Sequence, residues 1–91
     1  MPVIVEIPIV LQGYSNNKKN INLESGNLKK IFTDLGCLFP DLGKMLYNQN
    51  GNLKSYISVL HRGKIIKREK FDRIDIADGE KIKLLIPIGG G

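Results

Sequence analysis

The chain begins with a segment in which apolar side chains recur at every second position. The alternating positions are Val3, Val5, Ile7, Ile9 and Leu11. A period of two predicts a β-strand with one buried face. Pro8 cannot donate a hydrogen bond within a sheet, so it suits an edge or the end of the strand. After the turn-rich segment QGYSNN the alternation resumes, and residues 18–24 are predicted to form a second strand and a hairpin with the first.

Apolar residues then recur at helical spacing. They are Leu28, Ile31, Phe32, Leu35, Leu38 and Phe39. This pattern predicts an amphipathic helix over about residues 26–37, with Ser25 as its N-cap. Gly36 and Pro40 disfavour its continuation. Residues 41–47 are expected to add a short helical turn, with Leu42, Met45 and Leu46 facing inward.

The second half of the chain reads as further strands. Residues 56–60 and 65–66 predict a third and a fourth strand around a turn at Arg62 and Gly63. Phe71, Ile74 and Ile76 are expected to anchor the polar segment 67–78, and ADGE is a strong turn signal. Alternation from Lys81 to Ile88 predicts the last strand.

The predicted order is strand, strand, helix, strand, strand, strand. One helix can cover these strands only if they form a single sheet that folds around it. We therefore expect an α+β, β-grasp (ubiquitin-like) fold, with a mixed four- to five-stranded sheet wrapped around one main helix. The first hairpin is expected to pair parallel to the final strand. We expect a single domain, 1–91, with a flexible C-terminal glycine tail, 88–91.

The composition of the chain excludes several classes of protein. The net charge is +5, but acidic residues are mixed among the eight Lys and Arg residues between positions 62 and 83, so we expect no nucleic-acid partner. The sequence has no apolar run of roughly 20 residues and no signal peptide, which predicts a cytoplasmic protein without a membrane partner. Cys37 stands alone, which excludes an internal disulfide and iron–sulfur ferredoxins.

Two single residues invite a chemical role. Cys37 is interpreted as a small core residue, with a persulfide-accepting thiol as the alternative. His61 is interpreted as a surface residue beside a turn, in preference to a base or a ligand. We therefore predict neither a metal site nor a catalytic residue.

The last five residues are the unusual feature. The final predicted strand runs directly into Pro87, Ile88, Gly89, Gly90 and Gly91. Glycine loses the most entropy on ordering, so three of them do not help a fold. They suit a tail that threads through a narrow channel, since residues without Cβ let the backbone approach closely. Pro87 favours an extended approach to them. A disordered end is the alternative interpretation.

On these residues the chain resembles the ThiS/MoaD family of ubiquitin-like sulfur carriers. ADGEKIKLLIPIGGG resembles that family's closing pattern, and ISVLHRGKII resembles the strand–turn–strand before it. The opening, VEIPIVLQGYSNNKKNINL, resembles carriers that supply sulfide for cysteine synthesis, and the length also suits the small subunit of molybdopterin synthase. The extra glycine at position 89 departs from relatives that often carry alanine there.

The resemblance implies a mechanism in which the chain is a co-substrate and not an enzyme. A ubiquitin-activating-type adenylyltransferase would use ATP to adenylate the carboxylate of Gly91. Sulfur from a donor would displace AMP, and the resulting thiocarboxylate would serve a sulfur-accepting biosynthetic enzyme. The chain itself would bind no cofactor.

We also predict a docking patch for the activating enzyme. Leu60 and Leu85 are expected to form a small apolar surface ringed by Lys81 and Lys83. The sequence leaves one further function open, because the same activated tail can be passed to lysine amines of other proteins. The chain would then be a ubiquitin-like protein modifier.

Overall fold

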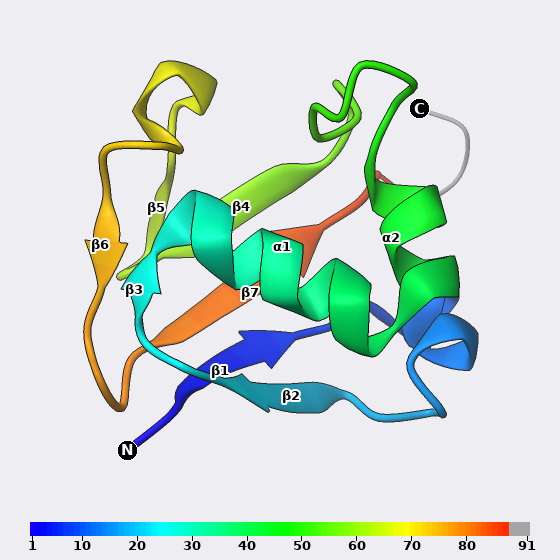
Figure 1. The fold of residues 1–91 in the computed structure, drawn as a ribbon, viewed down its shortest axis with the longest axis horizontal. Helices are drawn as coiled ribbons and strands as arrows, with labels where there is room; N and C mark the ends of the chain where they lie inside the picture. Colours follow the sequence, from blue (N-terminus) through cyan, green and yellow to red (C-terminus); the bar gives the residue numbers. More distant parts are fainter. Residues whose placement is uncertain (88–91) are drawn as a thin grey trace.

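A five-stranded mixed sheet and one main helix form the body of the molecule (Figure 1). The computed structural model describes residues 1–87. In space the strands follow the order β2-β1-β7-β4-β5. Their bounds are β1 Val3–Glu6, β2 Asn20–Leu23, β4 Ser58–His61, β5 Lys64–Ile65 and β7 Lys81–Leu85. A small second sheet pairs β3 (Gly26–Asn27) with β6 (Asp75–Ile76).

The register places the last strand in the centre of the sheet. β7 pairs parallel to β1, where Val5 faces Ile82, and antiparallel to β4, where Val59 faces Leu84. β1 and β2 form an antiparallel pair, as do β4 and β5. The predicted β-grasp fold and its parallel pairing are therefore confirmed.

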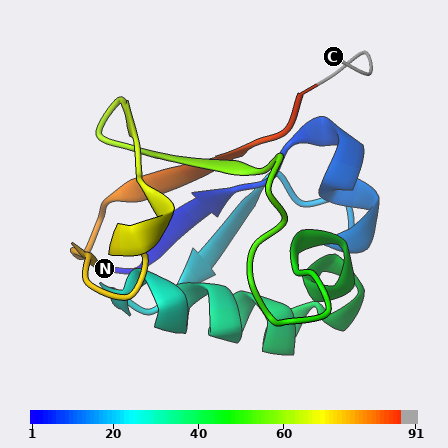
Figure 2. The same ribbon diagram turned by 90° about the horizontal axis from the view of Figure 1, so that it is seen from above.

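Helix α1 (Leu28–Leu38) lies across one face of this sheet (Figure 2). Its buried residues, Leu28, Ile31, Phe32 and Leu35, follow the helical period and pack on the inward side chains of the strands. The second helix, α2 (Pro40–Leu46), places Leu42 and Leu46 in the same core, while Met45 is partly buried against it. Two 3-10 helices, η1 (Ile9–Tyr14) and η2 (Arg68–Lys70), complete the described elements.

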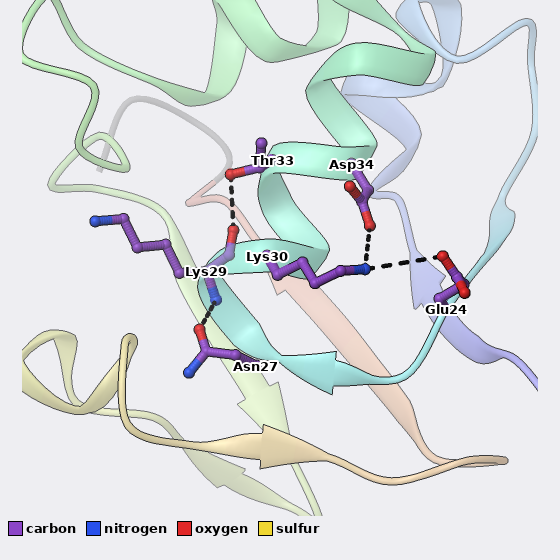
Figure 3. A network of polar contacts seen from close by, with 6 residues as sticks. All are labelled: Glu24, Asn27, Lys29, Lys30, Thr33 and Asp34. Atoms are coloured by element: carbon purple, nitrogen blue, oxygen red, sulfur yellow. Dashed lines mark hydrogen bonds and ion pairs between the residues drawn. The ribbon is translucent and has the colours of Figure 1, made fainter.

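The start of α1 differs from the prediction. Asn27, and not Ser25, is the N-cap, and its Oδ1 accepts a hydrogen bond from the Lys29 backbone N–H at 2.9 Å. On the solvent side, Lys30 Nζ lies 2.9 Å from Asp34 and 3.9 Å from Glu24 (Figure 3). The helix starts later because Gly26 and Asn27 pair with β6 first.

The end of α1 corrects two further details. Gly36 lies within the helix, which continues to Leu38, and Pro40 begins α2 instead of closing α1. Leu38, expected on the buried face, is 57% exposed, while Phe39 is partly buried. The chain turns at Phe39, so the helical stripe stops at Leu35.

The first strand is shorter than its alternation predicted. β1 ends at Glu6, and after Pro8 the chain turns into η1. Ile9 is therefore 85% exposed, whereas Leu11 remains buried. Pro8 marked this boundary, since it interrupts the ladder that the alternation alone would have extended.

The β4–β5 turn follows the prediction. Arg62 and Gly63 connect the paired residues His61 and Lys64, with φ of 54° and 77°. Positive φ at both positions is the type I′ geometry that matches the twist of a hairpin. β4 itself starts and ends later than predicted, and β5 is one residue earlier.

Within residues 1–87 no helix has the length and apolarity needed to cross a membrane.

Candidate functional site

The strand that precedes the glycine tail is β7, the central strand of the sheet. Ile82 and Leu84 are completely buried or nearly so, and β7 is hydrogen-bonded on both sides. After Leu85, Ile86 still packs against the core, while Pro87 is exposed. The core therefore holds the backbone up to Ile86. The predicted tail residues Ile88, Gly89, Gly90 and Gly91 lie outside the described residues.

The outer face of the sheet carries the predicted docking residues. Alternation along β7 directs Lys81, Lys83 and Leu85 away from the buried Ile82 and Leu84. Leu60 on β4 pairs with Lys83, so it lies on the same face and diagonal to Leu85. Both leucines are partly exposed. The structure thus brings the four residues onto one surface, next to the last described residues of the chain.

An acidic side chain, missed from the sequence, stands beside the two lysines. Lys81 Nζ lies 2.7 Å from Oε1 of Glu6, and Lys83 Nζ lies 3.3 Å from its Oε2. The Glu6 side chain is only 12% exposed, and the Lys81 hydrogen bond is the main cause of its lowered pKa. The lysines are therefore directed toward β1 as well as toward solvent. Glu6 pairs with Lys83 in the parallel register of β1 and β7, and the residue pattern of either strand alone does not reveal this register.

The apolar part of this face is larger than predicted. Ile65 on β5 pairs with Leu60 and is 62% exposed. Leu60, Ile65 and Leu85 together form what we call the outer apolar patch. Exposed aliphatic side chains grouped on one sheet face are typical of a protein-binding surface.

A polar cluster lies at the C-terminal end of β4, next to the β4–β5 turn. His61 Nε2 lies 3.1 Å from Oε2 of Glu80, the same oxygen accepts a hydrogen bond from Arg62 Nε at 2.5 Å, and Ala77 N–H donates to Oε1 at 2.9 Å. These contacts, led by that of Arg62, lower the pKa of Glu80 to about 2. The arrangement ties the β4–β5 turn to the start of β7.

The burial predicted for His61 and the burial predicted for Cys37 are both wrong. His61 is only 8% exposed, because β4 extends to this residue and directs its side chain inward. Cys37 is exposed, because the buried face of α1 ends at Leu35 and position 37 points elsewhere. Within the part of the chain that the structure describes, no group of three or more His, Cys, Asp or Glu side chains could hold a metal ion.

Several solved structures share this fold over nearly the whole chain. A chain in the BexX/CysO complex of Amycolatopsis orientalis superposes with a TM-score of 0.84 at 19% identity, over 98% of this chain and 99% of that chain. SAMP1 from Haloferax volcanii gives 0.83 at 17% identity, covering 100% of both chains. CysO from Mycobacterium tuberculosis, described as an antigen, gives 0.81 at 19% identity, over 94% and 99%. Comparison with protein-family models and with curated proteins gives no match.

Proposed function

We propose that this chain is a sulfur carrier whose reactive group is the carboxylate of Gly91. In this role the fold supplies a rigid support and the glycine residues supply a backbone that fits a narrow channel. The chain is a co-substrate of two other proteins, so it requires no catalytic residue of its own.

The central position of β7 is the observation that carries the proposal. The strand before the glycines is held on both sides, by β1 and by β4, and its inward side chains are buried. A partner that pulls on residues beyond Pro87 therefore pulls against the whole core and not against a fraying edge strand. Such an anchor suits a tail that another protein must hold in one position during chemistry.

The chemistry follows from the poor reactivity of a carboxylate. The Gly91 carboxylate attacks the α-phosphorus of ATP on the activating enzyme, which releases pyrophosphate and leaves an acyl-adenylate. Sulfide then attacks the acyl carbon and AMP leaves, which gives a thiocarboxylate. Gly89 and Gly90 let the backbone pass close to the nucleotide, and Pro87 with Ile88 extends the approach.

Two classes of partner are needed. The first is an adenylyltransferase of the ubiquitin-activating type, which docks on the surface formed by Leu60, Leu85, Lys81 and Lys83. The second is a biosynthetic enzyme that accepts the sulfur, in a cysteine, molybdopterin or thiamin type of pathway. A structural relative has been crystallised as a BexX/CysO complex, and this supports a carrier that works through protein partners.

Protein modification is the second candidate. The structures similar to this chain include small archaeal modifier protein 1 from H. volcanii, with a TM-score of 0.79. In this alternative a lysine amine, and not sulfide, attacks the acyl carbon of the Gly91 adenylate. AMP leaves, the amine loses a proton, and an isopeptide bond forms. Both functions need the same activated tail, so the fold is compatible with either.

The decisive experiment is intact-mass analysis after incubation with ATP, sulfide and a candidate activating enzyme. We expect the chain to gain the mass difference between sulfur and oxygen at one carboxyl group. Deletion of Gly91, or addition of one residue beyond it, should abolish this gain. Gly13→Ala, a change in open space on η1, should leave it intact.

The same protein isolated from its host separates the two candidates. A thiocarboxylate at Gly91 supports the carrier, while branched glycine-glycine peptides on lysines of other proteins support the modifier. If the natural chain permanently extends past Gly91, or if no activating enzyme forms an acyl-adenylate with it, both candidates fail.

A further inference from the structure

A basic groove lies between the β4–β5 hairpin and η2. It has a volume of about 590 Å³, and four basic side chains line it: Arg62, Lys64, Lys67 and Lys70. Asp75 is the single acid in its lining. The fold therefore gathers positive charge in this groove, although acidic residues lie between these basic residues along the sequence.

No acidic group that the structure describes pairs with the lysines of the groove. Lys64, Lys67 and Lys70 are exposed, and none of them forms an ion pair within residues 1–87. Arg62 differs, because Glu80 already accepts its Nε–H. Three ammonium groups thus remain available to an anionic partner.

The side chain of Arg68 holds the backbone around Lys67 and Lys70 in place. Arg68 lies between Lys67 and Lys70, and its guanidinium donates to the carbonyl oxygens of Leu53, Lys54 and Ile57 at 2.7, 2.6 and 2.7 Å. At the other side of the groove, Lys64 follows directly on the type I′ turn. Binding therefore costs little backbone ordering, which is a condition for useful affinity in a small site.

One wall of the groove is an open sheet edge. β5 is the outermost strand, and Ile66 N–H donates to Val59 O at 2.9 Å. Because hydrogen-bonding direction alternates along a strand, the N–H and C=O of Ile65 point away from β4. These two groups can pair with an extended segment from another protein.

The remaining lining is mostly aliphatic. Ile65 is largely exposed and Ile74 is partly buried. No Phe or Tyr within residues 1–87 lines the groove, and its one imidazole, that of His61, is buried against Glu80 and offers no open face for stacking. Single-stranded nucleic acids are bound mainly by basic side chains together with aromatic rings that stack on bases. Exposed isoleucine beside lysines instead favours a peptide that offers both carboxylates and aliphatic side chains.

We infer that this groove binds an extended acidic segment of a partner protein, in which aspartate or glutamate alternates with aliphatic residues. The segment pairs with the β5 edge, places its carboxylates on Lys64, Lys67 and Lys70, and covers Ile65. β7 starts beside His61 and ends beside Ser58, so the groove and the approach to the tail lie at opposite ends of these strands (Figure 1). A groove partner therefore covers Ile65 of the outer apolar patch but lies away from Leu85 and from the approach to the tail. The inference does not depend on the proposed sulfur chemistry.

Fluorescence anisotropy with a labelled peptide that alternates glutamate and leucine tests the inference on the full chain. We expect saturable binding that weakens as salt is raised, and at least about a tenfold loss of affinity in Lys64→Glu/Lys67→Glu/Lys70→Glu. The matched control is Lys18→Glu/Lys19→Glu/Lys44→Glu, which changes the net charge equally at exposed lysines outside the groove and should bind better than the groove variant. If the groove variant fails to fold by circular dichroism, the corresponding glutamine substitutions replace it.

Ile65→Ser separates a protein ligand from a polyanion. It should weaken binding of the glutamate–leucine peptide but not of a glutamate–serine peptide. Absence of peptide binding, equal loss in the groove and control variants, or tighter binding of a single-stranded oligouridylate that ignores Ile65→Ser would each overturn the inference. Charging of Gly91 is read separately by intact mass, and we expect it to be unchanged in the groove variant.

Discussion

The carboxylate of Glu80 shows how one side chain joins three segments. It accepts hydrogen bonds from the turn residue Arg62 and from the backbone N–H of Ala77, and it lies against the buried His61. Its side chain is only 18% exposed, so its contacts are partly shielded from water. The sequence placed Glu80 in a turn but could not reveal these partners, which depend on the long-range pairing of β4 with β7.

Glu80→Gln should make stability less dependent on pH in the acidic range. The folded pKa of Glu80, about 2, lies below the ordinary value of 4.5. Its contribution to the free energy of unfolding is therefore fully present above about pH 4.5 and is lost as the pH falls toward 2. In urea titrations from pH 7 to pH 2 we expect the variant to be less stable at pH 7, with a gap to the wild type that narrows on acidification.

The matched control for this experiment is Glu69→Gln. Glu69 is exposed and makes no side-chain hydrogen bond or ion pair within residues 1–87, so its replacement should change stability little at any pH. A gap for Glu80→Gln that stays constant from pH 7 to pH 2 would contradict the assigned role of its charge.

Two glycines in contact across α1 and α2 should respond to alanine in opposite ways. A Cβ on Gly43 would lie 3.3 Å from the Cα of Gly36, a backbone atom that cannot rotate away. A Cβ on Gly36 would meet the Tyr47 ring at 3.8 Å, which is an ordinary contact. We expect Gly43→Ala to cost about 1–3 kcal/mol by overpacking, and Gly36→Ala to stabilise by about 0.5–1 kcal/mol through helix propensity. Thermal unfolding of the two variants checks this, and shifts of the same sign would contradict it.

At the scale of elements, we predict that the packing of α1 on the sheet depends on one narrow buried face of the helix. Leu35 is completely buried, whereas Leu38, one turn later, is 57% exposed. Leu35→Ala should lower the free energy of unfolding by about 2–5 kcal/mol, because it removes contacts and leaves a cavity. Leu38→Ala is the control on the same helix and should cost less than about 0.5 kcal/mol. Chemical denaturation measures both free energies of unfolding. An equal loss in the two variants would show that Leu38, at the C-terminal end of α1, is also packed in solution.

Most of the elements were predictable from periodicity, and their boundaries were less so. The alternation from Val3 to Leu11 predicted that β1 exists but extended it beyond Glu6, because the buried Leu11 of η1 continues the same pattern. Only Pro8 indicated the boundary. Helical spacing predicted α1 but extended its buried face to Leu38. Local patterns report which side chains are apolar, while the position at which a chain turns depends on what it packs against.

The candidate site could be predicted only in part for the same reason. The outward positions of Leu60, Lys81, Lys83 and Leu85 follow from strand alternation and proved correct. The contacts of both lysines with Glu6 required the parallel register of two strands from opposite ends of the chain. A residue pattern within one strand carries no information on that register.

At the scale of the whole molecule, charge is distributed over two surfaces, the basic groove and the outer face of the sheet, which meet at Ile65. The basic groove at β5 and η2 contains three lysines without an acidic partner among residues 1–87, while the lysines of β7 share Glu6. The two surfaces differ in what they offer to a partner. The groove presents charge at a sheet edge, and the outer face presents the apolar patch with its charges partly compensated.

The outer face should determine how fast the activating enzyme binds. Lys81→Glu/Lys83→Glu reverses both charges beside Leu85, and we expect it to slow association with that enzyme by roughly tenfold at low salt, an effect that diminishes as salt is raised. Glu6→Gln tests the same surface in the opposite direction, because it removes the carboxylate that compensates both lysines and should speed association. Lys29→Glu/Lys44→Glu, an equal charge change at exposed positions on α1 and α2 instead of the outer face of the sheet, should have less effect than the β7 variant. Stopped-flow association rates measure all three, and a rate and affinity unchanged in the β7 variant would show that the enzyme does not dock on this face.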